Sequence, residues 1–181
     1  LSSWGRGDWV PVHSRSSLEL TSSVYFFVDA SILARAAELF GRSEDHARYA
    51  ALAEKIRTAI NRKYYNPQTG LYASGTQTEL SVPLLWGVVP EEEIPRVAEN
   101  LARRVEEAGC HLDVGVLGAR AILDALCRNG HAETAYRVAV QTTYPSWGWW
   151  IVNGATTLLE NWDLEATRDI SDNHMMFGEI G

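Results

Sequence analysis

The sequence contains little cysteine and offers no clear ligand set for a metal. Its two cysteines, Cys110 and Cys127, lie seventeen positions apart. Structural zinc sites need close pairs of Cys or His ligands, and no second pair accompanies Cys110 and His111. We therefore expect two buried free thiols, and we predict neither a metal site nor a cofactor.

Positive charge and long apolar runs are also scarce. With 16 Lys and Arg against 23 Asp and Glu, the net charge is −7, and a nucleic acid would need clustered positive side chains. No segment approaches the roughly 18 apolar residues of a membrane helix, and the first residues do not resemble a secretion signal. We therefore predict that neither nucleic acid nor a membrane is a partner. Because the chain starts at Leu1 without Met, we expect a piece of a longer protein, whose location is left open.

The periodicity of apolar residues predicts a helical chain. With 181 residues, of which 46% are hydrophobic, the chain can form one domain or a large piece of one. Apolar residues recur at steps of three and four, which places them on one face of each helix. The predicted helices cover residues 21–40, 43–60, 77–86, 90–109, 114–127, 131–141 and a short segment from about residue 155.

Tight turns and longer polar loops alternate between these helices. This pattern is typical of stacked antiparallel helical hairpins in an all-α protein. Hairpins of roughly 40 to 50 residues occur in closed α-toroids and in open α-solenoids, and the pattern alone does not separate the two.

Tryptophan is abundant outside the clear helical faces. Flat indole rings suit the C–H faces of sugars and the rims of small-ligand pockets, although the same rings can also close the ends of a helical barrel. The chain has seven tryptophans, and five lie outside those faces: Trp4, Trp9, Trp147, Trp149 and Trp150.

Three polar residues accompany these tryptophans in the sequence: Asp8, Glu160 and His174. Glu160 follows an apolar turn between Leu159 and Trp162, where desolvation and fixed neighbours would hold a carboxylate for general-base catalysis. The alternative is an ordinary solvated acid near a helix end.

Several motifs in fixed order resemble the bacterial α-L-rhamnosidases of glycoside hydrolase family 78, and the resemblance spans essentially the whole chain. The motifs are Gly7-Asp8-Trp9, Thr76-Gln77-Thr78, His111 to Gly115, Thr142 to Trp147, Gly154 to Trp162 and Asn173 to Gly178.

The resemblance implies an (α/α)₆ barrel, a toroid of six hairpins, of which residues 1–181 form about the C-terminal half of one catalytic domain. It also implies inverting hydrolysis of terminal α-L-rhamnosides, which needs a general acid and a general base about 6.5–9.5 Å apart. Glu160 matches the general base of the family. Trp9 and His174 match residues of the family that contact the sugar, and we predict Asp8, Trp147 and Trp149 as further sugar-binding residues.

The general acid of the family lies in an acidic, Arg-containing segment upstream of Gly-Asp-Trp, and this chain does not contain such a segment. The resemblance therefore implies that the chain alone is inactive, and that its partners are a rhamnose-containing glycoside and either the N-terminal half of the barrel or a second copy. Two departures bear on the substrate or linkage: Leu159 replaces a bulky aromatic, and Gly148-Trp149-Trp150 follows Trp147. A non-catalytic carbohydrate-binding or scaffold module, and a barrel glycosidase of other specificity, are the alternatives.

Overall fold

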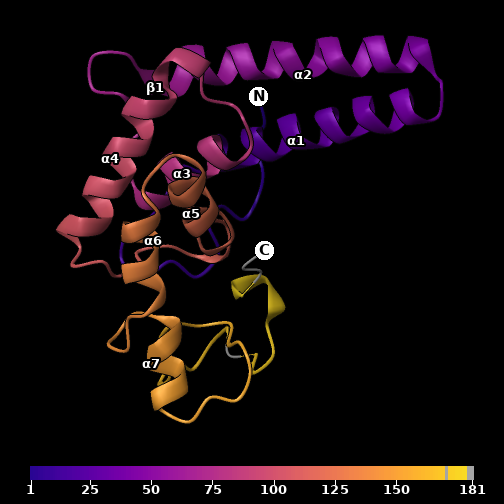
Figure 1. Cartoon of the computed structure of the whole chain (residues 1–181). Coiled ribbons are helices and arrows are strands. Elements are labelled where there is room, and N and C mark those ends of the chain that lie inside the picture. The colour runs from indigo at the N-terminus through magenta and orange to yellow at the C-terminus, as the bar shows by residue number, and fades with distance from the viewer. Residues whose placement is uncertain (170, 179–181) are drawn as a thin grey trace.

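The computed structural model describes residues 1–169 and 171–178, and within them the chain is mainly helical (Figure 1). A single two-stranded antiparallel hairpin interrupts the helices, with Tyr65 opposite Tyr72. The elements, in chain order, are α1 (Leu18–Leu39), α2 (Ser43–Tyr64), β1 (Tyr65–Asn66), β2 (Leu71–Tyr72), α3 (Gln77–Leu85), the 3₁₀ helix η1 (Glu91–Glu93), α4 (Ile94–Glu107), α5 (Val116–Arg128), α6 (Ala132–Ala139), α7 (Trp147–Val152) and the 3₁₀ helix η2 (Met175–Phe177).

Local capping explains where several helices begin. The Ser17 hydroxyl accepts a hydrogen bond from the Leu20 amide at the start of α1. Thr76 and Glu79 form a reciprocal capping box at the start of α3. These contacts satisfy amide groups that the first turn of a helix leaves unpaired.

The all-α prediction is confirmed, and one predicted helix is wrong. Residues 153–160 contain no helix, and the tryptophan-rich segment before them forms α7. The Ser146 side chain accepts from the Trp149 amide and so caps α7, whereas Gly154 adopts a φ of 92°. The left-handed backbone at Gly154 ends the preceding turn and separates it from the extended chain that follows.

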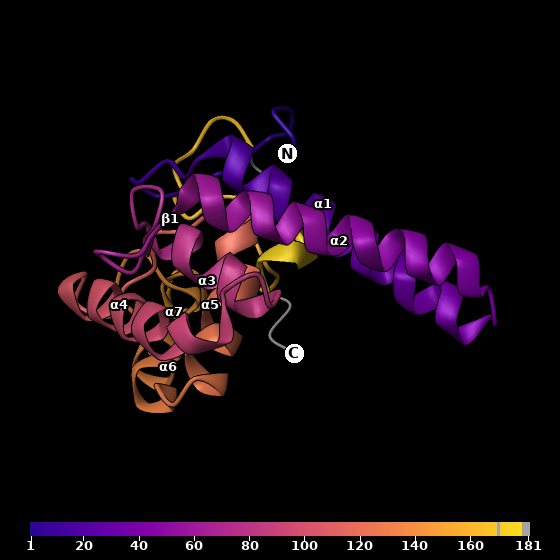
Figure 2. The same ribbon diagram turned by 90° about the horizontal axis from the view of Figure 1, so that it is seen from above.

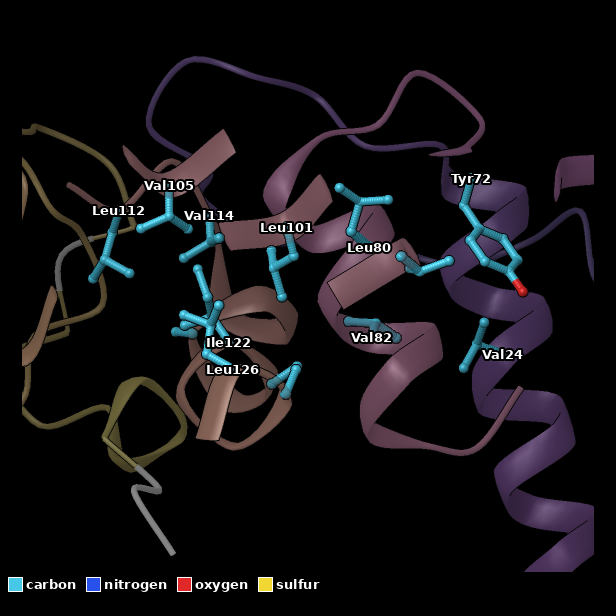
Figure 3. Packing of buried hydrophobic residues seen from close by; sticks show 14 of the residues in the cluster. Val24, Tyr72, Leu80, Val82, Leu101, Val105, Leu112, Val114, Ile122 and Leu126 are labelled. Carbon is cyan, nitrogen blue, oxygen red and sulfur yellow. The ribbon is translucent and has the colours of Figure 1, made fainter. Parts of the chain in front are cut away.

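The core lies among the central helices. In this core, α3 packs against α4 and α5, and α5 also packs against α6. Figure 3 shows buried side chains from these elements, including Leu80, Leu101 and Ile122. Cys110 belongs to this core, but Cys127 is exposed near the end of α5, so the expectation of two buried thiols is wrong for Cys127.

The hairpin of α1 and α2 extends away from the other helices (Figure 2). Its far end exposes large apolar side chains, with exposed fractions of 59% for Ile32, 71% for Leu39 and 81% for Phe40. No helix in the described residues is both long and apolar enough to cross a membrane.

The segments that lead into α1, α3, α5 and α7 are joined by hydrogen bonds in that order. Ser16 and Thr76 hydroxyls lie 2.8 Å apart, and the Gln77 side chain donates to the carbonyl of His111 at 3.0 Å. The His111 ring in turn lies 2.7 Å from the Thr143 hydroxyl. These bonds link the N-terminal ends of four helices in a series.

Candidate functional site

Glu160 lies in the irregular connection after α7, which folds back on itself. The Glu160 amide donates to the carbonyl of Ser171 at 2.9 Å, and the His174 amide donates to the carbonyl of Leu158 at 2.7 Å. Residues 158–160 therefore lie beside residues 171–174. This pairing fixes the backbone that carries the predicted catalytic glutamate and the predicted sugar-binding histidine.

Two N–H groups hold the Glu160 carboxylate. The Trp9 indole N–H donates to Oε1 at 3.0 Å, and the Ser171 amide donates to Oε2 at 3.1 Å. The Trp9 hydrogen bond, followed by the Ser171 amide and the nearby His174 ring, lowers the pKa of Glu160. Each carboxylate oxygen can accept a second hydrogen bond, so a water molecule can still bind.

The predicted environment of Glu160 is wrong in one respect. The sequence predicts desolvating apolar surroundings for this carboxylate, but its side chain is only partly buried. Trp162, its expected apolar neighbour, is buried and donates its indole N–H to the Val114 carbonyl at 2.7 Å. Hydrogen bonds therefore favour the ionised form of Glu160, and desolvation only weakly opposes it.

Asp8 is buried, with an exposed fraction of 7%, and it caps the N-terminus of α5. Its oxygens accept from the Thr78 hydroxyl and from three backbone amides, those of Gly115 at 2.7 Å, Leu117 at 2.8 Å and Gly118 at 3.2 Å. Burial raises the pKa of Asp8, and these hydrogen bonds oppose that rise. The structure thus places this predicted sugar-binding residue beneath the surface, with protein donors on both oxygens.

Trp9 follows Asp8 and reaches the carboxylate from the first loop of the chain. Its carbonyl accepts from the Val116 amide at 2.9 Å, and the Arg6 guanidinium lies 5.0 Å from the ring centroid. Trp9 and Glu160 are 151 positions apart in sequence. The structure therefore brings together two of the predicted site residues that local sequence patterns could not connect.

The remaining tryptophans divide between core and surface. Trp147 is only 7% exposed and donates its indole N–H to the Phe177 carbonyl at 2.6 Å, while Trp150 stacks on Trp162 with centroids 4.6 Å apart. The rings of Trp147, Trp150 and Trp162 are therefore part of the core beneath the connection that follows α7. Trp149 is partly buried and packs edge-on against Tyr144, with centroids 6.2 Å apart.

His174 lies at the edge of this aromatic cluster, 5.6 Å from the Phe177 ring centroid. Its Nδ1 atom is buried and has no hydrogen-bond partner within the described part of the chain. A buried ring nitrogen without a partner is unusual in proteins, and this sets His174 apart from the other residues of the cluster.

Sequence reasoning missed two residues that shape this end of the molecule. Glu79 is 1% exposed and accepts from the Ser17 amide at 2.7 Å, which ties the start of α1 to α3. The Thr-x-x-Glu spacing of the capping box is a signal that identifies Glu79. Ser171 acts through its backbone, so its residue type carries no comparable signal.

Two open pockets flank the contact between Trp9 and Glu160. The pocket beside Glu160 has a volume of about 230 Å³ and includes Ser171 and Asp172 in its lining. The pocket beside Trp9 is larger, about 480 Å³, and is lined also by Arg6, His13 and Arg15. Binding pockets for small ligands usually measure about 300–1,000 Å³, so only the pocket beside Trp9 lies in that range.

Comparisons with known proteins agree with this architecture. The whole chain, residues 1–181, matches the family described as bacterial alpha-L-rhamnosidase 6 hairpin glycosidase domain. A curated α-L-rhamnosidase of Streptomyces avermitilis is 32% identical over 98% of this chain and 18% of its own length.

Two solved structures resemble the chain closely. The α-L-rhamnosidase of Dictyoglumus thermophilum has a TM-score of 0.88 at 38% identity, over 97% of this chain and 20% of that one. The Streptomyces avermitilis α-L-rhamnosidase complexed with L-rhamnose has a TM-score of 0.90 at 32% identity, over 98% of this chain and 18% of that one. The chain therefore spans about a fifth of the length of these relatives. Because the family match extends over every residue, the chain belongs to the bacterial α-L-rhamnosidase six-hairpin glycosidase family.

Proposed function

We propose that the protein containing this chain hydrolyses terminal α-L-rhamnosides with inversion, and that Glu160 is its general base. The observation that carries this proposal is the ionised Glu160 carboxylate, which Trp9 and Ser171 hold by two N–H groups and which retains free acceptor positions. The family membership supports the substrate class. The bound L-rhamnose in the Streptomyces avermitilis relative supports it as well.

In this mechanism, Glu160 accepts a proton from a water molecule while the water oxygen bonds to the anomeric carbon. The bond from that carbon to the leaving oxygen breaks, and a general acid protonates this oxygen. We propose that the acid comes from a part of the protein outside this chain, opposite Glu160. Inversion follows because the water attacks the face opposite the leaving group, without a covalent intermediate.

We assign the sugar contacts to residues that reach the surface near Glu160. Trp9, Trp149 and His174 are each only partly buried. Asp8 and Trp147 are buried and hydrogen-bonded to the protein, so we assign them no direct contact with the sugar.

We further propose that other helices of a six-hairpin toroid cover the exposed apolar side chains of α1. Leu39 and Phe40 at the end of the α1–α2 hairpin are large apolar side chains that are mostly exposed, as expected for a surface that another part of the protein covers. Analytical ultracentrifugation of residues 1–181 alone tests this point, because uncovered apolar faces should cause self-association. A stable monomer would contradict it.

The activity is tested with the full-length protein and an aryl α-L-rhamnoside. We expect release of L-rhamnose, and we expect Glu160→Gln to lower kcat by about 10²–10⁴-fold, because an amide cannot accept the proton. Glu165→Gln is the matched control, since Glu165 is an exposed acid in the same loop. Turnover of a different aryl glycoside in place of the rhamnoside would contradict the substrate class, and full activity of Glu160→Gln would remove Glu160 from the mechanism.

A further inference from the structure

A short chain of contacts connects the start of α5 to the Glu160 carboxylate. Asp8 binds the first amides of α5, and the Val116 amide binds the carbonyl of Trp9. The indole N–H of the same tryptophan then donates to Glu160 at 3.0 Å. Trp9 is thus held on its backbone by α5 and presents its ring to the proposed base.

Helix α5 depends on Asp8 for its cap because its own N-cap residue is Gly115, which has no capping side chain. Each oxygen of Asp8 accepts two hydrogen bonds: Oδ1 from the amides of Leu117 and Gly118, and Oδ2 from Gly115 and Thr78. A carboxylate at a helix N-terminus also interacts favourably with the helix dipole.

The backbone of this contact leaves no room for adjustment. A Cβ atom on Gly115 would lie 2.2 Å from the Trp9 carbonyl oxygen, far inside van der Waals contact. The first loop and the start of α5 are therefore pressed together at the position where Asp8 and Trp9 adjoin. A change in how Asp8 binds α5 moves Trp9 as well.

Other carboxylates anchor the same loop at a distance from Trp9. Asp113 accepts from the amides of His13 at 2.8 Å and Ser14 at 3.0 Å, and also from the Ser14 hydroxyl. This anchor resembles that of Asp8 in chemistry, but it fixes the loop at residues 13–14. Asp113 therefore serves as a control that loosens the same loop without acting directly on Trp9.

We propose that Asp8 is a positioning residue that acts on the reaction through Trp9, by fixing the indole N–H on the Glu160 carboxylate. This role rests on the proposed function of Glu160 as general base. It differs from a sugar contact, because Asp8 acts from beneath the site. It also differs from a purely structural cap, because its loss changes the protonation of Glu160.

The test is Asp8→Asn in the full-length protein, assayed on an aryl α-L-rhamnoside between pH 3 and pH 8. The amide turns one acceptor oxygen into a donor that faces backbone N–H groups, so Trp9 shifts away from Glu160. We expect kcat to fall by at most about tenfold, because an effect that runs through the Trp9 indole N–H cannot exceed the loss of that N–H. We also expect the acid limb of kcat/KM to move to higher pH, because the Trp9 hydrogen bond lowers the pKa of Glu160.

Asp113→Asn is the matched control, since it loosens the same loop at His13 and Ser14. It should lower the thermal midpoint without moving the acid limb. An equal shift of the limb in Asp113→Asn and Asp8→Asn would overturn the proposed role of Asp8, because any loosening of the loop would then suffice.

A double-mutant cycle with Trp9→Phe separates positioning from general damage. If Asp8 acts through the indole N–H, Asp8→Asn causes no further shift of the acid limb once Trp9 is Phe. Additive shifts would overturn the proposed role of Asp8.

Thr78→Val is the second variant, for use if Asp8→Asn does not fold, because it removes one donor to Asp8. We expect a smaller shift of the acid limb in the same direction, and an unmoved limb would again overturn the role. Activity retained by Glu160→Gln would instead refute the proposed function, so the two failures are distinct.

Discussion

The start of α5 and the loop of residues 153–174 each hold one carboxylate of the site, and they hold it in opposite ways. Asp8 at the start of α5 is buried and receives two donors on each oxygen. Glu160 in the loop is partly exposed and receives one recorded donor on each oxygen. Trp9 joins the two regions, because its backbone belongs to the first and its indole N–H reaches the second.

This difference separates a carboxylate that stabilises the structure from one that is available for chemistry. Burial raises the pKa of Asp8, whereas hydrogen bonds lower the pKa of Glu160. A saturated carboxylate cannot accept a proton from water without losing a protein donor. A carboxylate that has free lone pairs and is kept ionised by two N–H groups can accept this proton without losing a protein donor.

The largest expected effect is on stability, when Asp8 and Glu160 are each replaced by Ala. Asp8→Ala leaves the first amides of α5 and the Thr78 hydroxyl without their acceptor, so we expect a loss of about 3 kcal/mol in the free energy of unfolding. Glu160→Ala removes two hydrogen bonds from a partly exposed carboxylate, so the thermal midpoint should fall, but by much less than in Asp8→Ala. Differential scanning calorimetry of the full-length protein measures both, with Glu165→Ala as a control. Equal thermal midpoints for the two variants would contradict the claim that Asp8 stabilises the structure more than Glu160 does.

The next effect concerns the residue that connects the two regions. Trp9→Phe keeps an aromatic ring but removes the indole N–H donor, so the pKa of Glu160 should rise toward its ordinary value of 4.5. We expect kcat to fall roughly tenfold, less than the 10²-fold or more that loss of the base itself would cause. The pH profile of kcat/KM should show its acid limb at higher pH. An unmoved limb would mean that Trp9 does not hold the base ionised.

The unmodified full-length protein should already show the lowered pKa of Glu160. Because Glu160 must be ionised to accept a proton, activity is present above its lowered pKa and is lost as the pH falls through it. At pH 4.5, the ordinary value, Glu160 is more than half ionised, so kcat/KM should exceed about half of its plateau. The stability that these hydrogen bonds contribute follows the same direction: it is present above pH 4.5 and is lost at lower pH. An acid limb above pH 4.5 would contradict this assignment.

The smallest expected effect is at Ser171. The contacts of Ser171 with Glu160 run through its amide and carbonyl groups, and its side chain is exposed. Ser171→Ala should therefore change kcat by less than about twofold, as is usual for surface positions. Steady-state kinetics measure the ratio, and a large loss would show that the hydroxyl takes part in the site.

Local sequence patterns predicted most of the fold. The steps of three and four residues placed α1 to α6. The position of α7 was missed because it depends on the Ser146 cap and on tryptophans that pack under the loops, whereas the apolar run of residues 155–159 has the composition of a helix without its cap. Composition alone did not decide between these two segments.

The site was less predictable, because its geometry depends on contacts between distant residues. Asp8 reaches amides that lie at least 107 positions away, and Trp9 reaches Glu160 across 151 positions. Sequence motifs named these residues, but they could not show that Asp8 binds a helix and that Glu160 is held by hydrogen bonds in place of burial. The roles of the named residues toward the sugar stay predictions.

The central claim is that Glu160 activates water and does not merely help to bind the sugar. The most direct measurement compares turnover of an aryl α-L-rhamnoside with the Kd for L-rhamnose in Glu160→Gln, by steady-state kinetics and isothermal titration calorimetry on the full-length protein. We predict that kcat falls at least about 10²-fold while the Kd changes by less than about threefold. A kcat that is retained, or a loss of turnover that only mirrors a loss of rhamnose affinity, would contradict the claim.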